Sequence, residues 1–457
     1  MKVLFAIAEL DFADHIAIAY LSAIARQNGC QTYLSILDTN NFQEDVGRIR
    51  PDVIAYSANV IGFESIVKAH LQASARHHFT SILGGPQATF SPETFEKSGM
   101  DAYCIGEGEY AFSDFLTRLK RSEPFDDIPN LITKTGRNPV RDLVRDLDDL
   151  PFPDRDLTLS STFLKTTPKK TFYATRGCPF KCSYCCNNLY HELYRGKGTF
   201  VRRFSVDRVL SEIEYVKSRY RTDFIKFGDD CFALKADTWV EEFSEQYPKR
   251  IGIPFNCFLR IDTITERLLH LLKKAGCHSV HLSIDSASKH VRENVLKRRM
   301  RTNNFLPILK MINSYGINTW VNYMLAAPDS TLEDDIETIR MSKEGKVTYP
   351  AYSTTVPMYG TELYNYCVER KLIDPVNHKS DMTGCTEKSN ISSFTDREKD
   401  IRFNIYLLGA VISKLPFPLD RLAVELIKII RPNELFRRMR RIMYKYYIEN
   451  KIFKLPA

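Results

Sequence analysis

The sequence predicts an α/β protein built from two successive series of alternating strands and helices, followed by a mainly helical region. Short apolar runs alternate with stretches of helical spacing over residues 1–120 and again over residues 169–360. An acidic, proline-punctuated stretch, residues 146–154, separates the two series and cannot continue a helix. Such alternation is typical of parallel sheets whose strands are joined by crossover helices.

The length and composition are those of a soluble protein with several domains. At 457 residues the chain exceeds the size at which one core stops growing, so two or three domains are expected. The hydrophobic fraction of 44% and the charged fraction of 26% are ordinary. No apolar run is long enough to predict a membrane-spanning helix, and acidic residues soon follow the short apolar N-terminus, unlike a signal peptide. Eleven cysteines without an export signal indicate reduced thiols in a cytoplasmic protein.

The first series places glycine-rich turns at the ends of its strands. The Gly-Gly-Pro of residues 84–86 and the Gly-Glu-Gly of residues 106–108 each follow an apolar run. Ligands of parallel sheets bind at the carboxyl ends of strands, so these turns mark the expected site. No Gly-x-Gly-x-x-Gly follows the first strand, which disfavours a dinucleotide. The expected strands are residues 2–8, 31–37, 53–57, 81–83 and 102–105, and the expected helices are residues 16–27 and 63–76.

Three thiols stand at Cys-x-x-x-Cys-x-x-Cys spacing directly after the first strand of the second series: Cys178, Cys182 and Cys185. Thiolates hold iron–sulfur clusters, and a tight loop brings three of them to one centre. Three protein ligands on a four-iron cluster leave one iron open, where chemistry can occur. The alternative is a structural zinc site with Cys186 as fourth ligand, although adjacent cysteines rarely ligate one metal in good geometry.

This spacing, with Tyr184 before the last cysteine, resembles the signature of the radical S-adenosylmethionine (SAM) superfamily. The resemblance implies a [4Fe-4S] cluster on the three cysteines, with Tyr184 as an aromatic wall beside the open iron. That iron chelates the amino and carboxylate groups of SAM, which is cleaved to a 5′-deoxyadenosyl radical. The resemblance also implies an external electron donor of the flavodoxin or ferredoxin type.

The second series supplies six strand–helix units, which suit the partial, TIM-like (β/α)6 barrel of that superfamily. Ligands of such barrels bind at the carboxyl ends of the strands. The expected strands are residues 171–175, 224–227, 255–259, 279–284, 319–325 and 352–356. The expected helices are residues 206–220, 238–246, 265–274, 303–315 and 332–343.

Two strand ends in this series carry charged residues for SAM. Gly228, Asp229 and Asp230 resemble the superfamily's acidic turn, which receives the methionine amino group. Helix capping is the alternative role for either carboxylate. Arg260 follows the third strand, where it would pair with the methionine carboxylate or the ribose, or else be a surface charge.

The later turns match the superfamily less closely. Ser283 and Asp285 occupy the place of its Glu-Ser turn, which implies a contact to SAM, although the acid is one methylene shorter. Residues 324–330 lie where the superfamily has a Gly-x-Pro-Gly-Glu turn, but both glycines are missing. Residues 357–363 resemble the phrase that closes the barrel. The remaining thiols of the region are expected to be packed rather than to bind a second cluster: Cys186, Cys231, Cys257 and Cys277.

The first series resembles the cobalamin-binding domain that precedes many radical SAM cores. The resemblance rests on residues 50–57, 84–89 and 106–109, which come in the right order and spacing. It implies that cobalamin contacts are made by Ser57, Gly84, Gly85, Gly106 and Glu107, with glycines letting the backbone approach the corrin. A domain whose ligand site has been lost is the alternative.

Two departures concern the lower face of the cobalamin. Gln87 stands where the family often has His, and the Asp-x-His-x-x-Gly segment that ligates cobalt in other proteins is absent. We expect His15 to be a loop residue, and any bound cobalamin to lack a protein His ligand.

The C-terminal region resembles no family that we can name. Residues 405–412 and 422–430 have helical spacing, and residues 437–445 are strongly basic. A solvated helix on the barrel is the first interpretation, and a peripheral membrane contact is the second. Nucleic acid is not expected as a partner, because no RNA-binding module accompanies the basic residues.

Together these features predict a cobalamin-dependent radical SAM enzyme that methylates an unactivated carbon of a metabolite, lipid or tetrapyrrole. Alternatives are ring closure or oxidation without methyl transfer, an RNA methylthiotransferase, and a non-catalytic cobalamin or redox sensor. A methylthiotransferase needs a cysteine-rich N-terminal domain, whereas only Cys30 and Cys104 precede the barrel. The expected divisions are a cobalamin-binding domain (1–125), a linker (126–168), a radical SAM core (169–362) and a helical region (363–457).

Overall fold

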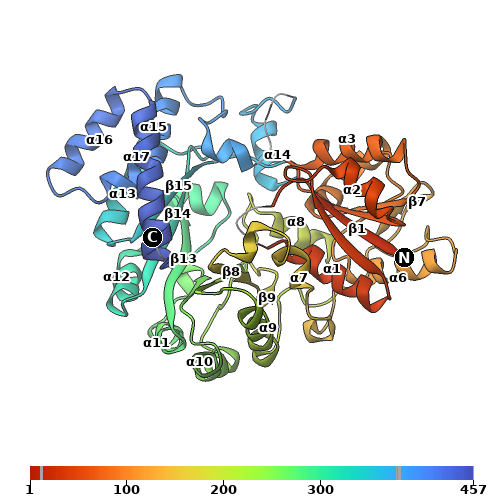
Figure 1. The fold of residues 1–457 in the computed structure, drawn as a ribbon. Coiled ribbons are helices and arrows are strands. Elements are labelled where there is room, and N and C mark those ends of the chain that lie inside the picture. Colours follow the sequence, from red (N-terminus) through yellow and green to blue (C-terminus); the bar gives the residue numbers. More distant parts are fainter. Residues whose placement is uncertain (11–13, 377, 379–381, 456–457) are drawn as a thin grey trace. The chain divides into compact units, whose positions relative to one another are not determined.

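The computed structural model describes residues 1–10, 14–376, 378 and 382–455, and the chain forms two compact units (Figure 1). The N-terminal unit comprises Met1–Lys170, Leu189–Phe204 and Val216–Arg221. The barrel unit comprises Thr171–Asn188, Ser205–Tyr215 and Thr222–Ala457. Two segments beyond the cysteine loop thus belong to the N-terminal unit, which the sequence pattern did not indicate.

The N-terminal unit is built on a seven-stranded sheet with the strand order β2-β1-β3-β4-β5-β6-β7. Neighbours from β2 to β5 pair in parallel, whereas β6 and β7 are antiparallel additions at one edge. The predicted parallel sheet is therefore confirmed. The strands are β1 (Lys2–Ile7), β2 (Gln31–Ile36), β3 (Val53–Ser57), β4 (Thr80–Gly84), β5 (Ala102–Cys104), β6 (Leu131–Thr133) and β7 (Gly136–Arg137).

Both faces of this sheet are buried, which explains why its strands read as unbroken apolar runs. In β1, Val3, Phe5 and Ile7 belong to one hydrophobic cluster, whereas Leu4 and Ala6 belong to another. Successive side chains of a strand point to opposite faces, so each cluster lies on one side of the sheet. The helices of this part are α1 (Ile16–Gln27), α2 (Phe42–Ile49), α3 (Phe63–Ser74), α4 (Pro86–Phe90), α5 (Phe95–Ser98) and α6 (Glu109–Lys120).

The stretch expected as a linker is folded onto the N-terminal unit. It supplies β6 and β7, and helix α7 (Arg155–Leu159) is held there by a buried ion pair. Arg155 Nη1 donates to Asp14 Oδ2 over 2.6 Å, and Thr158 donates to the other carboxylate oxygen. Strands of two or three residues are too short to show an alternating pattern, so periodicity does not predict them.

The barrel unit contains a six-stranded sheet with the order β15-β14-β13-β12-β11-β8. The registered pairs from β11 to β15 are parallel, and β8 and β15 are the two edges. Within the described ranges, this six-stranded parallel sheet does not close on itself, so the predicted partial (β/α)6 fold is confirmed. The strands are β8 (Lys169–Phe172), β11 (Phe224–Phe227), β12 (Phe255–Phe258), β13 (Cys277–Asp285), β14 (Asn318–Leu325) and β15 (Tyr349–Thr354).

Three of the connecting helices, α10, α11 and α13, begin at polar caps. Asp237, Thr265 and Thr331 each accept a backbone hydrogen bond at a helix start, and Thr331 forms a capping box with Asp334. The helices are α8 (Cys186–Leu193), α9 (Val206–Arg219), α10 (Thr238–Arg250), α11 (Glu266–Ala275), α12 (Leu306–Ser314) and α13 (Leu332–Glu344).

The C-terminal region is mainly helical, as predicted, and is part of the barrel unit. Helix α15 (Asp396–Ile412) packs on β15 and is buried almost all round, and its Arg402 Nε pairs with buried Asp335 over 2.7 Å. The π-helix η7 (Lys445–Ile452) ends against β13, where Ser279 Oγ donates to Ile452 O over 2.7 Å. The other helices are α14 (Glu362–Glu369), α16 (Leu419–Ile429) and α17 (Glu434–Tyr444).

A search of the described residues for membrane spans found no helix with both the length and the apolar character to cross a bilayer.

Candidate functional site

A cavity of about 330 Å³ lies in the barrel unit where strands β11, β12 and β13 end. Its wall contains all three cysteines of the predicted cluster motif, Cys178, Cys182 and Cys185. Asp229 and Arg260, from the turns after β11 and β12, line the same cavity. The structure therefore brings the thiols and the charged residues predicted for SAM into one site, at the barrel end where ligands bind.

The cysteine loop is fixed by backbone hydrogen bonds made by Ser183. Its N–H donates to Leu296 O over 2.9 Å, and its Oγ donates to Val295 O over 2.7 Å. Its carbonyl accepts from the N–H of Leu363 over 2.9 Å. The loop thus rests on the π-helix η5 (Val291–Val295) on one side and on the start of α14 on the other.

Arg260 fixes the loop from the opposite wall of the cavity. It is buried, which excludes the surface charge that the sequence left open. Its guanidinium stacks over the Phe180 ring at 3.8 Å, and its Nε donates to Asp262 Oδ1 over 2.7 Å. Stacking and a carboxylate partner together hold a planar cation in one orientation.

The three thiols differ in exposure and acidity. Cys182 is buried, whereas Cys178 and Cys185 are partly exposed. Burial raises the pKa of the Cys178 thiol to about 12. A hydrogen bond from Cys186 lowers the pKa of the Cys185 thiol to about 7. Cys186 itself is exposed, so the expectation that it is packed was wrong, whereas Cys231, Cys257 and Cys277 are buried as expected.

The donor set fits an iron–sulfur cluster better than a zinc ion. In the described ranges of the chain, no three thiol, imidazole or carboxylate groups converge closely enough to hold a single metal ion. A four-iron cluster takes each thiolate on a different iron, so its ligands stand farther apart than the ligands of one zinc. Soft thiolates around a shared cavity match that requirement.

One carboxylate oxygen of Asp229 accepts hydrogen bonds from neighbouring residues, and the other has no hydrogen-bond partner among the described residues. Oδ1 accepts from the N–H groups of Ala174 (2.8 Å) and Thr175 (2.6 Å) and from Thr175 Oγ1 (2.8 Å). Oδ2 is buried and has no hydrogen-bond partner among the described residues. A buried, partnerless carboxylate oxygen in a cavity wall fits a bound ammonium group.

The capping alternative for the acidic turn is wrong, because the N-cap of the next helix, α10, is Asp237. Burial raises the pKa of Asp229 to about 6. Asp230 remains exposed at the edge of the cavity, and Gly228 is pressed against Tyr173, where a Cβ would come within 2.8 Å of the ring.

Arg298 is a cavity residue that the sequence analysis missed. Its Nε lies 2.9 Å from Asp285 Oδ2, and its Nη2 donates to Ser283 O over 2.9 Å. Its Nη1 donates to Tyr184 Oη over 3.1 Å and lies 3.9 Å from Cys182 Sγ. One partly buried cation thus connects the cysteine loop to the end of β13.

Arg298 lies beyond η5 in an irregular segment, where no periodicity marks a site residue. The only available signal was its place in the basic run of residues 297–301. Among the predicted residues, Tyr184 and Ser283 line the cavity, whereas Asp285 is not part of its wall. Tyr184 Oη donates to Asp285 Oδ2 over 2.7 Å, so this acid is engaged by Tyr184 and Arg298.

Three residues near the site adopt left-handed backbone conformations that usually favour glycine. Asp285 has φ 69°, and in the turn after β14, Ala326 has φ 56° and Asp329 has φ 63°. The two glycines missing from this turn are therefore replaced by residues that keep a glycine-like backbone. Asp335 Oδ2 accepts from Ala326 N over 3.2 Å, which helps to hold this strained turn.

The turn after β4 in the N-terminal unit has room for a ligand. Ser57 ends β3, and a Cβ on Gly84 would meet no protein atom within 4 Å. Gly85 has φ 90°, and a Cβ there would meet Ala58 O at 2.8 Å and Ser57 Oγ at 3.1 Å. An open backbone surface of this kind fits a flat ligand.

The turn after β5 is filled by the protein itself. A Cβ on Gly106 would overlap Tyr194 Oη, which accepts from Glu107 N over 2.6 Å. The Glu107 carboxylate forms a two-point ion pair with Arg202, at 2.6 and 3.0 Å. Both residues are thus bound within the N-terminal unit, unlike the open turn after β4.

Two other residues near the predicted cobalamin site have defined places. Gln87, which stands where the related domain often has His, is buried in α4. His15 lies directly before α1 and makes no capping hydrogen bond.

Two separate parts of the chain match known families. The profile of the Radical SAM superfamily matches residues 172–341, and that of the B12 binding domain matches residues 1–116. The solved structure of the cobalamin-dependent S-adenosylmethionine radical enzyme OxsB with aqua-cobalamin bound has a TM-score of 0.70 at 17% identity. The structural match covers 99% of this chain and 73% of OxsB, and it supports the fold.

Distant relatives include proteins named for methyl transfer and for ring closure. An uncharacterized methyltransferase of Pyrococcus horikoshii is 25% identical, covering 79% of this chain and 80% of its own. Hopanoid C-3 methylase of Methylococcus capsulatus is 25% identical over 63% of this chain and 56% of its own. Anaerobic magnesium-protoporphyrin IX monomethyl ester cyclase of Rubrivivax gelatinosus is 22% identical over 76% of this chain and 65% of its own.

Proposed function

The chain belongs to the cobalamin-dependent radical S-adenosylmethionine enzymes, and on this premise we propose that it methylates an unactivated carbon of a metabolite, lipid or tetrapyrrole. The observation that carries the proposal is a cavity with three thiols and a partnerless buried Asp229 oxygen, in a chain that also has a B12 binding domain. Two of the relatives described above are named for methyl transfer, which favours that reaction.

Different residues of the cavity would bind the cluster and SAM. Cys178, Cys182 and Cys185 would hold the cluster, and Asp229 Oδ2 would accept from the methionine ammonium. Arg298, whose side chain is 11% exposed in the same wall, would face the methionine carboxylate. When bound, the cluster and SAM supply a carbon-centred radical, and cobalamin supplies a methyl carrier.

The protein's own contribution is to position these groups. Ser183 and Arg260 hold the cysteine loop, and the Tyr184–Asp285–Arg298 network holds the facing end of β13. A wall held in place by these contacts reduces the reorganisation needed when charged ligands bind.

In the N-terminal unit, the turn after β4 is the proposed cobalamin contact. Gly84, Gly85 and Ser57 present backbone and a hydroxyl there. Gly106 and Glu107 were predicted to touch cobalamin, and we now propose that they shape the neighbouring turn through Tyr194 and Arg202.

We also propose two partners beyond the substrate. An external electron donor of the flavodoxin or ferredoxin type would reduce the cluster, because no second set of cysteines in the sequence has the spacing of a cluster motif. The basic C-terminus would bring the protein to the surface of a membrane. Ring closure is the second candidate reaction, because the relative from Rubrivivax gelatinosus is named a cyclase.

The test uses SAM carrying an isotopically labelled methyl group. Anaerobically reconstituted protein with cobalamin should move the label into the cobalamin fraction and release S-adenosylhomocysteine, as measured by mass spectrometry. Gly84→Val should lose this transfer while keeping its iron. Release of 5′-deoxyadenosine with the label recovered only in methionine, and none in cobalamin, in protein shown to hold cobalamin, would contradict methyl transfer and favour ring closure or oxidation.

A further inference from the structure

Helix α16 carries an apolar stripe that faces solvent. Leu419, Leu422, Leu426 and Ile429 recur at a spacing that places them on one helix face. Their exposed fractions are 50%, 57%, 53% and 67%. The four side chains thus form a continuous exposed ridge along three turns of helix.

A separate face of α16 makes the packing contacts of the helix. Val424 and Ile427 are buried, and α16 packs against α15. Asn404 of α15 donates from Nδ2 to Ile427 O over 2.9 Å, which fixes α16 in place. The outer stripe is therefore not needed to hold the helix on the protein. Contiguous exposed apolar surface of this kind usually marks an interaction site.

Large exposed apolar side chains continue beyond both ends of the helix. Phe417, just before it, is 68% exposed, and Ile430, just after it, is 41% exposed. Helix α17 adds Leu435 and Ile442, both largely exposed, and no residue of α17 is buried.

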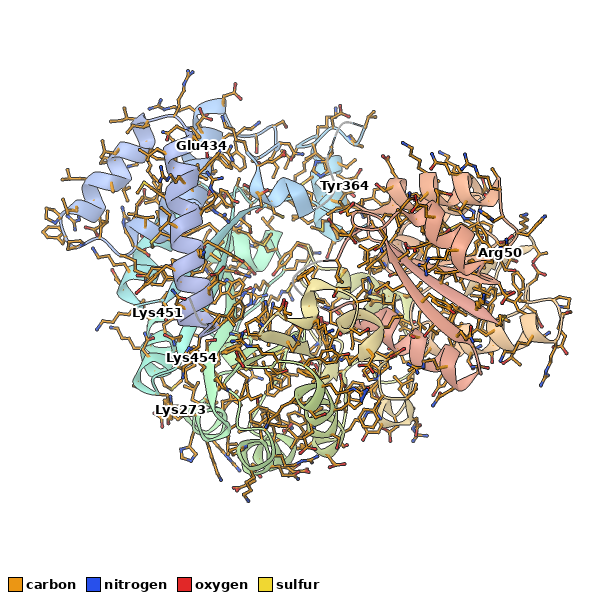
Figure 2. All side chains as sticks on the ribbon, viewed as in Figure 1. Arg50, Lys273, Tyr364, Glu434, Lys451 and Lys454 are labelled. Carbon is orange, nitrogen blue, oxygen red and sulfur yellow. The ribbon has the colours of Figure 1, made fainter. Side chains whose placement is uncertain are left out.

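The chain that follows α16 is strongly basic. Residues 431–445 contain six basic residues and one acidic residue, Glu434, which pairs with Arg441 over 2.5 Å. Figure 2 labels Glu434 at the start of α17. The guanidinium groups of Arg437 and Arg440 lie over the rings of Phe403 and Tyr406 in α15, at 5.0 and 4.2 Å.

These stacked arginines hold α17 on α15, while other basic side chains stay outside. Arg431, Arg438, Arg441 and Lys445 are all exposed. Helices α16 and α17 both pack on α15 at the C-terminal end of the barrel unit (Figure 1). The exposed leucines of α16 and the exposed basic residues of α17 are thus carried by two helices that both pack against α15.

We propose that α16 and α17 form a docking surface for an anionic lipid membrane, with the α16 stripe entering the boundary between headgroups and acyl chains. Apolar side chains beside basic ones match the two layers of such a surface, because lipid phosphates attract the bases and the acyl boundary takes the leucines. With no membrane-spanning helix among the described residues, the contact is peripheral.

A second copy of the chain matches this surface less well. Face-to-face pairing would bring two sets of exposed arginines together, and like charges at an interface oppose association. An anionic bilayer can bind both the apolar side chains, at the acyl boundary, and the basic side chains, at the lipid phosphates. The inference sharpens the membrane contact proposed above and depends on no step of the proposed methyl transfer, so the two fail separately.

The test measures flotation of the full-length, cluster-loaded protein with vesicles. Wild type should bind vesicles of phosphatidylcholine mixed with phosphatidylglycerol, and bind phosphatidylcholine alone more weakly. The double variant Leu422→Glu/Leu426→Glu should lose roughly tenfold or more in affinity. Arg438→Gln/Lys445→Gln should lower the affinity for anionic vesicles and its dependence on salt.

The matched control is Leu71→Glu, which changes a leucine of similar exposure, 48%, on α3 of the N-terminal unit. It should bind vesicles as wild type does, and iron content should be unchanged in all variants. Equal vesicle binding by wild type and the stripe variant, or no binding by either, would overturn the proposal. So would a wild-type dimer that the stripe variant converts to monomer in sedimentation, because the stripe would then be a contact between copies.

Discussion

Removing the Arg298 cation should destabilise the barrel unit strongly. Arg298→Met keeps much of the side-chain length but leaves the Asp285 carboxylate, 3% exposed, without its partner at 2.9 Å. Breaking a buried pair by removing one charge typically costs about 3–5 kcal/mol. The loss of hydrogen bonds to Ser283 O and Tyr184 Oη acts in the same direction.

A second substitution separates the cost of leaving the Asp285 charge unpaired from the other effects of Arg298→Met. Asp285→Asn removes the unpaired charge, and Asn tolerates the left-handed backbone at φ 69°. The double variant Arg298→Met/Asp285→Asn should therefore be more stable than Arg298→Met by about 2 kcal/mol. Arg370→Met is the matched control, because it breaks the half-exposed pair with Asp329 and should cost less than about 1 kcal/mol.

The assay is urea unfolding followed by tryptophan fluorescence. The chain has two tryptophans, Trp239 in α10 and Trp320 in β14, and both belong to the barrel unit. The signal therefore reports the unit that contains Arg298. An Arg298→Met midpoint equal to that of wild type, or a double variant no more stable than the single one, would refute the buried ion-pair network.

Three further predictions concern the cluster, cobalamin and pH. Cys186→Ala should keep about four irons per chain after anaerobic reconstitution, whereas Cys182→Ala should lose them, and equal loss of iron in both would refute the ligand assignment. Gly84→Val should leave the unfolding midpoint measured by far-UV circular dichroism unchanged, because its side chain meets open space, while cobalamin affinity measured by absorbance titration falls roughly tenfold or more, and an unchanged affinity would place the corrin elsewhere. Burial raises the pKa of Asp229, whose Oδ1 accepts only from N–H and hydroxyl groups, to about 6, above its unfolded value of about 3.9, so its protonation favours the folded state. The contribution of this group to the stability of the cluster-free barrel unit should therefore rise as pH falls from about 7 to about 4, and Asp229→Asn should flatten that slope; an unchanged slope would contradict the raised pKa.

The sequence contained most of the information about the sheets and the cysteine loop. Each long strand is buried on both faces, so it reads as an apolar run, as β1 does, and the six units of the barrel could be counted from such runs. The thiol spacing pointed to one loop, and the structure places all three thiols on one cavity.

The residues that were missed act through contacts between segments far apart in the chain. Arg298 meets Cys182 and Tyr184 only because Ser183 rests on the segment before it. Gly106 was read as a ligand-binding glycine because nothing in its own turn shows that Tyr194 covers it.

The exposure of the outer face of α16 also could not be predicted from the sequence pattern. Residues 422–430 were read as an ordinary apolar helix, because periodicity shows that apolar residues share a face and not which of two faces is covered. Only the exposed fractions of Leu422 and Leu426 show that one face is bare.

Release of 5′-deoxyadenosine is the most direct test of the central claim that this chain performs radical SAM chemistry. Reduced, cluster-loaded protein with SAM should form 5′-deoxyadenosine slowly even without substrate, as measured by chromatography, and Cys178→Ala should form none. Cluster-loaded, reduced wild type that binds SAM yet forms no 5′-deoxyadenosine would contradict the account and favour a cobalamin or redox sensor.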